Sequence, residues 1–129
     1  MSNFQESCLT YFFVAYGDGF NLRDFCARLG LSYEEMQNWD NGESLTIGWN
    51  NSFDIDINVM VRKSLGVLMG QAKELAKLKE EYGLEYYLAR VPTLIGETEK
   101  PRQILSLAAD VIRFLAESGT SDDLDYYIL

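Results

Sequence analysis

The segment at residues 8–16, Cys-Leu-Thr-Tyr-Phe-Phe-Val-Ala-Tyr, limits the fold more than any other part of the chain. Its β-branched and aromatic side chains favour a β-strand, and both faces of that strand are largely apolar. A strand of this kind belongs inside a sheet that is covered on at least one side. We therefore expect residues 8–16 to form an interior strand around which the other elements assemble.

Three further strands are predicted where apolar and polar residues alternate, which is the pattern of a strand with one buried face. They cover residues 44–50, 84–91 and 124–129. Pro92 lacks a backbone donor and therefore ends the third strand or places it at an edge of the sheet. Asp122 and Asp123 are expected in an exposed turn before the last strand, whereas Asp125 is expected inside that strand.

Helical spacing of apolar residues occurs in two long segments. A first helix is expected between Asn21, which is suited to cap a helix N-terminus, and Gly30, which is suited to end one. Residues 56–82 have the same spacing, but Gly66 and Gly70 interrupt it. Glycine is a poor helix former, so we expect a kink or break near Gly70.

Two shorter segments also begin with residues that cap helices. Ser32 opens a stretch that fits a capping box, although the structure of residues 31–43 stays ambiguous, and Trp39 to Gly42 has the composition of an exposed turn. Ser106 is the candidate cap of a last helix that ends at Gly119.

The order of these elements predicts an α+β fold in a single domain over residues 1–129. We expect a four-stranded, mostly antiparallel sheet packed with helices. The two halves resemble βαβ units joined by a long kinked helix, which is the ferredoxin-like plan. The alternative is an α/β fold with parallel crossovers, since strands and helices alternate along the chain.

Charge and histidine content exclude several classes of function. The chain has 11 Lys and Arg against 20 Asp and Glu, for a net charge of −9, and it has no His. Nucleic acids and anionic membranes are therefore disfavoured as partners. The absence of His removes His-based nucleophile activation, acid–base catalysis and His metal sites. We expect no enzymatic activity.

Carboxylate and cysteine motifs do not add up to a catalytic or metal site. Asp54 and Asp56 begin like a calcium-binding loop, but Val59 stands where that loop requires glycine. Asp56 is more simply the cap of the following helix. Cys8 and Cys26 are expected to be buried, reduced thiols. We therefore predict no metal and no cofactor, and the lack of a signal sequence or membrane span predicts a cytoplasmic protein.

Several landmarks, each weak alone, occur in a characteristic order and spacing over about residues 8–129. They are the stretch from Tyr11 to Gly17, Trp39 with Gly42, Trp49, Glu81-Tyr82-Gly83, Ile104 to Leu107, and Asp125 with Tyr127. In these landmarks the chain resembles the bacterial domain-of-unknown-function family 4279, while residues 32–38 depart from that family's pattern. The resemblance implies a small cytosolic protein without assigned chemistry, some of whose relatives are like immunity proteins encoded beside toxins. It carries over no catalytic residue.

We therefore expect a protein-interaction module, and most concretely an immunity-type inhibitor of a toxin with a basic surface. An acidic surface attracts a basic partner, and tyrosine is common at protein interfaces. The alternatives are a carboxylate-based metal-binding enzyme and a small-ligand sensor. The candidate interaction surface consists of acidic and aromatic residues, namely Trp39, Asp54, Asp56, Tyr87, Asp122, Asp123, Asp125 and Tyr127.

Overall fold

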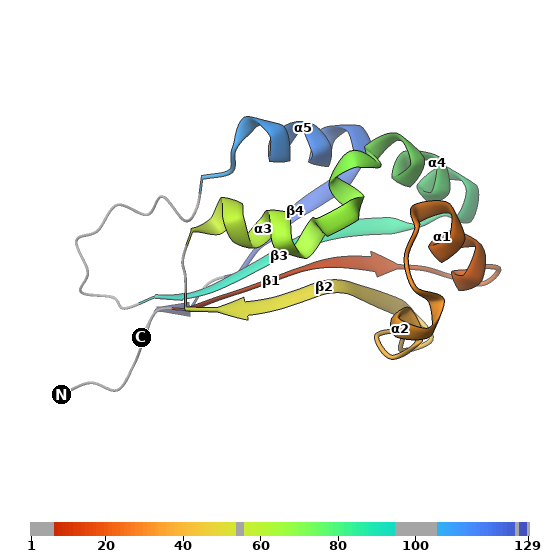
Figure 1. The fold of residues 1–129 in the computed structure, drawn as a ribbon, viewed down its shortest axis with the longest axis horizontal. Helices are drawn as coiled ribbons and strands as arrows, with labels where there is room; N and C mark the ends of the chain where they lie inside the picture. The colour runs from red at the N-terminus through yellow and green to blue at the C-terminus, as the bar shows by residue number, and fades with distance from the viewer. Residues whose placement is uncertain (1–6, 54–55, 95–105, 126, 129) are drawn as a thin grey trace.

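The computed structural model describes residues 7–53, 56–94, 106–125 and 127–128. Its elements alternate between strands and helices along the chain (Figure 1). In chain order they are β1 (Ser7–Ala15), α1 (Leu22–Leu29), α2 (Tyr33–Gln37), β2 (Ser44–Ser52), α3 (Ile57–Leu65), the 3₁₀ helix η1 (Gly66–Gly70), α4 (Ala72–Tyr82), β3 (Glu85–Leu94), α5 (Ala109–Ser118), β4 (Thr120–Leu124) and β5 (Tyr127–Ile128).

The strands form a mixed sheet in the order β2-β1-β3-β4, and the short β5 also pairs with β3. β1 is antiparallel to both β2 and β3, whereas β3 and β4 are parallel. These pairings confirm the expected α+β class with a mostly antiparallel sheet. They also confirm that the first strand is an interior one, because β1 has a neighbour on each side.

The connection between β1 and β2 differs from the ferredoxin-like plan. A split βαβ unit keeps its two strands parallel and apart, but β1 and β2 are adjacent and antiparallel. The backbone N–H of Tyr16 donates to the carbonyl of Glu43, and this contact ties the start of β2 to the end of β1. The Asn41 side chain accepts from the N–H groups of Glu43 and Ser44 and turns the chain there. Among the described strands, the parallel pairing of the alternative α/β plan joins β3 to β4 and β3 to β5.

The last strand begins earlier than predicted. β4 starts at Thr120, so Asp122 and Asp123 lie in a strand and not in a turn, and Asp125 lies between β4 and β5. Gly119 ends α5 in the left-handed conformation, with φ 73°, and this lets the chain pass from the helix directly into the strand.

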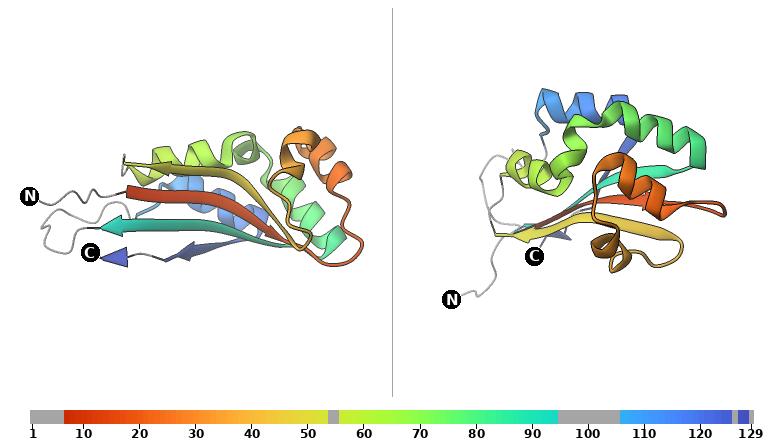
Figure 2. Two further views of the ribbon diagram at one scale, coloured as in Figure 1. Left: turned by 90° about the horizontal axis from the view of Figure 1, so that it is seen from below. Right: turned by 45° about the vertical axis from the view of Figure 1, so that its right-hand side comes forward.

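Four of the helices, α1, α3, α4 and α5, lie over the same side of the sheet (Figures 1 and 2). The expected caps of α1 are confirmed, since the Asn21 side chain accepts from the N–H of Asp24 and Gly30 closes the helix. The long helical segment is broken as predicted, with η1 between α3 and α4. Between the helices and the sheet lies a core of aliphatic and aromatic side chains that includes the buried, unpaired Cys8 and Cys26.

Helix α5 begins three residues after the predicted cap. Ser106 does not cap it, because the N-cap position is taken by Ala108. The backbone N–H of Ala108 instead donates to the side-chain oxygen of Asn58 in α3, at 2.7 Å. A contact between two distant helices therefore sets the start of α5, and spacing along the chain does not reveal such a contact.

Gly48 forms a bulge in β2 that brings the edge of the sheet against α3. Thr10 pairs with Asn50 and Phe12 with Ile47, so two residues of β2, Gly48 and Trp49, lie opposite the single residue between them on β1. Gly48 has φ 69°, which is the left-handed region that favours glycine in such bulges. Its α-carbon faces the backbone of Ser64 so closely that no side chain would fit there.

Replacing Phe25 by Ala should lower the free energy of unfolding by about 3–5 kcal/mol, as expected for a buried aromatic residue. The Phe25 side chain is fully buried on α1, and its ring packs edge-to-face on that of Phe20, with centroids 5.4 Å apart. Urea unfolding of both proteins would measure the loss. A loss below about 1 kcal/mol would mean that the buried face of α1 contributes little to the core.

Candidate functional site

The side of the sheet that faces away from α1, α3, α4 and α5 has no described helix over its centre (Figures 1 and 2). We call this side the open face. Side chains of β1 alternate between full burial under the helices and partial exposure on the open face, where Leu9, Tyr11 and Phe13 lie. The register places Tyr87 beside Phe13 and Ala89 beside Tyr11. The open face is therefore aromatic along its central two strands.

A shallow depression of about 280 Å³ lies in the open face. It is lined by Tyr11, Phe13, Tyr87, Ala89 and Asp123, which come from β1, β3 and β4. The Phe13 and Tyr87 rings are in contact, with centroids 6.2 Å apart and planes tilted by 50°. Ala89 has a single methyl group between larger neighbours, so it leaves the space that the depression occupies.

The charges that β1 to β4 place on the open face are negative. Glu85 and Asp123 are the charged residues there, and both are exposed. The Tyr87 hydroxyl donates to a carboxylate oxygen of Glu85 at 2.7 Å. This hydrogen bond, together with the negative charges of Glu85 and Asp123 and partial desolvation, raises the pKa of Tyr87 above its ordinary value. Tyr87 therefore keeps its proton, and that proton is directed at Glu85.

The bulge at Gly48 adds a third aromatic residue beside this region. Because Gly48 is turned toward α3, its neighbour Trp49 projects on the other side, opposite Tyr11 in the register. The Trp49 side chain is 50% exposed. The aromatic character of the open face thus continues from β3 across β1 to the edge strand β2.

Of the eight residues predicted for the interaction surface, the structure brings together Tyr87 and Asp123. Trp39 is exposed, but it lies along the outer edge of β2, where its carbonyl accepts from the N–H of Thr46. Asp56 is the cap of α3, as predicted from its position, and its carboxylate accepts from the N–H groups at the start of that helix.

The other four predicted residues lie elsewhere or are outside the description. Asp122 points to the helix side of the sheet and binds Arg90. Asp125 is exposed, and its backbone N–H donates to the carbonyl of Arg90. Asp54 lies outside the described residues, and Tyr127 is described only by its backbone in β5, which pairs with Thr93.

The pair Arg90–Asp122 joins β3 to β4 on the helix side of the sheet, with Arg90 buried and the Asp122 side chain 33% exposed. Arg90 is 3% exposed, and its Nε and Nη2 donate to the two carboxylate oxygens of Asp122 at 2.9 and 2.5 Å. Such a bidentate pair fixes both side chains in one geometry. Asp122 therefore holds a buried arginine on the helix side of the sheet, whereas its neighbour Asp123 lies on the open face.

Sequence reasoning did not select Tyr11, Phe13 and Ala89 for the site. The alternation over residues 8–16 contains the signal, since Leu9, Tyr11 and Phe13 share one face of the strand. Both faces of this strand are apolar, however, so the sequence does not show which face the helices cover. The difference between the two faces appears only in the packing.

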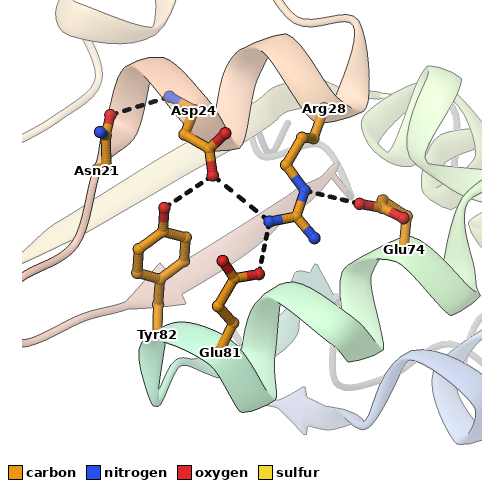
Figure 3. A network of polar contacts seen from close by, with 6 residues as sticks. All are labelled: Asn21, Asp24, Arg28, Glu74, Glu81 and Tyr82. Atoms are coloured by element: carbon orange, nitrogen blue, oxygen red, sulfur yellow. Dashed lines mark hydrogen bonds and ion pairs between the residues drawn. The ribbon is translucent and has the colours of Figure 1, made fainter.

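A second polar cluster joins α1 to α4 on the helix side of the sheet (Figure 3). Arg28 donates to Glu74 at 2.8 Å and to Glu81 at 2.5 Å, and it also pairs with Asp24. The Tyr82 hydroxyl donates to Asp24 at 2.7 Å. Hydrogen bonds from Glu81 and Glu74 raise the pKa of Arg28 above its ordinary value. Because these groups bind one another, the cluster holds two helices together.

Neither a metal-binding cluster nor a membrane-spanning helix occurs among the described residues. No group of three or more Cys, Asp and Glu side chains is placed to hold a metal ion. Within the same residues, no helix has both the length and the apolar character needed to cross a lipid bilayer.

Comparisons of the chain with family models, with curated proteins and with solved structures gave no significant match. The resemblance to the domain-of-unknown-function family 4279 therefore stays a prediction.

Proposed function

We propose that the protein is a non-enzymatic interaction module whose open face docks on a partner protein with a basic surface. The observation that carries this proposal is the aromatic depression formed by Tyr11, Phe13 and Tyr87, with Glu85 and Asp123 as the charged groups of the same face. An immunity-type inhibitor that covers a basic toxin is the form of this function that the acidic sequence favours. The cytoplasm is the proposed location.

Aromatic side chains on an uncovered sheet face support a binding role. Tyrosine and tryptophan contribute large contact areas with little loss of side-chain freedom, and they are enriched at protein interfaces. Exposed apolar patches rimmed by polar residues commonly mark interaction sites. Tyr11, Phe13, Tyr87 and the half-exposed Trp49 provide such a patch on three adjacent strands.

Charge favours a basic partner over a second copy of the same chain. The net charge is −9, so two copies repel each other, whereas a cationic protein is attracted. Glu85 and Asp123 give the open face itself the sign of the whole molecule. Electrostatic attraction of this kind raises the association rate and weakens as salt screens it.

The positions of the carboxylates support binding over the metal-enzyme alternative. Asp56 is occupied in capping α3, Asp122 binds Arg90, and Asp123 lies on the opposite face of the sheet from Asp122. General acid–base chemistry needs such groups to converge on one substrate.

The proposal predicts that Tyr87→Ala weakens partner binding at least tenfold, because it removes one wall of the depression. Partners would be captured from a lysate of the host on the immobilised protein. The affinity of each identified partner for the wild type and the variant would then be measured by calorimetry. Ile112→Ala is the matched control, since Ile112 is an exposed apolar residue on α5, away from the open face. It should leave the affinity unchanged.

The same complex should associate more slowly as salt rises, which stopped-flow measurements over a salt series would follow. Equal affinity of the wild type and the Tyr87→Ala variant for every captured partner would contradict the proposal. A flat salt dependence would remove the argument from charge. Turnover of a substrate by the purified protein would contradict the proposal that it is not an enzyme.

A further inference from the structure

We infer that the depression on the open face is an anchor site for an arginine side chain of the partner protein. This inference rests on the proposed function and makes it specific. Tyr11, Phe13, Tyr87, Ala89 and Asp123 line a space of about 280 Å³ in which three aromatic rings and one carboxylate meet. Aromatic faces and a carboxylate together recognise a cation that is also flat.

The aromatic rings supply the first part of this recognition. A guanidinium group stacks on aromatic faces because its charge is attracted by the ring electrons and its hydration is weak. Phe13 and Tyr87 are already in contact, at 6.2 Å between centroids, so the walls of the depression are formed before a partner arrives. Ala89, which is 4% exposed, forms a small floor and leaves room for the incoming group.

Asp123 supplies the opposite charge. Glu85 accepts the Tyr87 hydroxyl and Asp122 binds Arg90, but no cation of the described residues pairs with Asp123. Its carboxylate therefore remains available to accept hydrogen bonds from a partner. Arginine binds a carboxylate through two parallel N–H donors, which gives both orientation and affinity.

The Tyr87 hydroxyl adds a neutral acceptor at the same place. Its proton is donated to Glu85, at 2.7 Å, so the lone pairs of the oxygen face away from that bond. The raised pKa of Tyr87 keeps this arrangement at neutral pH. A guanidinium has five N–H donors and no acceptor, and it matches a site that offers a carboxylate and a hydroxyl oxygen in this way. A lysine ammonium lacks the flat face that stacks on the rings.

The test uses three capped tripeptides, glycine-X-glycine, in which X is arginine, lysine or citrulline. Citrulline has nearly the shape of arginine but no charge. Binding would be followed by NMR on the protein with labelled aromatic rings. We expect the arginine peptide to shift the resonances of Tyr11, Phe13 and Tyr87 in a saturable way. The lysine peptide should bind several-fold more weakly, and the citrulline peptide should not saturate the site.

Two variants locate the site without altering the core. Asp123→Asn should weaken arginine binding about tenfold, because a charge-assisted hydrogen bond becomes a neutral one. Tyr87→Phe keeps the ring and removes the acceptor, so a smaller, roughly threefold loss is expected. Glu80→Gln on α4 changes the net charge equally on the helix side and should have no effect. Thermal melting would verify that all variants remain folded.

The outcomes separate this inference from the proposed function. Equal shifts with arginine and citrulline, or an Asp123→Asn variant that binds arginine like the wild type, would overturn the anchor site. An identified partner that loses affinity with Tyr87→Ala but not with Asp123→Asn would also overturn the anchor while leaving the proposed function standing. Arginine binding in the depression without any protein complex that depends on the open face would contradict the proposed function and leave only the arginine-binding site itself standing.

Discussion

Replacing Gly48 by Ala should lower the free energy of unfolding by about 5 kcal/mol or more, which is comparable to the whole stability of many domains of this size. A β-carbon at this position would lie 1.7 Å from the carbonyl oxygen of Ser64. Real β-carbons are not found closer than 3.0 Å to such an atom, so α3 and β2 would have to separate by more than 1 Å.

Moving α3 away from β2 is costly because it would also disturb buried polar contacts between α3 and β1. The Ser64 hydroxyl contacts the Thr10 hydroxyl at 2.5 Å and donates to the Thr10 carbonyl at 3.2 Å, and both residues are buried. Moving α3 would leave these groups without partners in the interior, which costs about 1–3 kcal/mol for each. The left-handed backbone of Gly48 adds about 1–2 kcal/mol for any other residue.

Gly42→Ala is the matched control for this prediction. Gly42 also has a positive φ, at 90°, but open space surrounds the position of its β-carbon. The same substitution there carries the backbone cost alone, and we expect a loss of about 1–2 kcal/mol. Urea unfolding of both variants would measure the difference. Similar losses for Gly48→Ala and Gly42→Ala would mean that α3 moves away from β2 without cost.

Local features of the fold were predictable because they depend on neighbouring residues. Asn21 and Gly30 begin and end α1 through contacts within four residues, and Gly66 and Gly70 break the long helix through their own backbone freedom. The interior position of β1 followed from its apolar composition. In each case the physical cause lies within the segment itself.

Features that depend on contacts between distant segments were not predictable. The start of α5 is set by Asn58, and the bulge at Gly48 is set by the approach of Ser64. The candidate surface residues are scattered over the fold for a related reason. Placing the last strand at residue 124 left the directions of Asp122 and Asp123 undetermined, whereas a strand from Thr120 sends neighbouring side chains to opposite faces.

Asp122→Lys and Asp123→Lys should therefore affect different properties of the protein, although the two changes are chemically identical and adjacent. The first should lower stability, and the second should abolish arginine binding. Asp122→Lys removes the bidentate carboxylate from the buried Arg90 and places a second cation beside it. The Asp122 side chain is 33% exposed, so solvent screens part of the loss, but the new lysine adds the repulsion of a like charge. Together these effects should cost about 3–5 kcal/mol. We expect this variant to lose a large part of its free energy of unfolding.

Asp123→Lys should change the stability by no more than about 0.5 kcal/mol, because Asp123 is exposed and binds no described cation. It should nevertheless abolish arginine binding in the depression, since the anchoring charge is reversed. Urea unfolding measures the first effect and NMR titration with the arginine peptide measures the second. If the Asp122→Lys variant were as stable as the Asp123→Lys variant, the ion pair between Asp122 and Arg90 would not contribute to stability as predicted. The division of this acidic pair between the helix side and the open face of the sheet would then have to be abandoned.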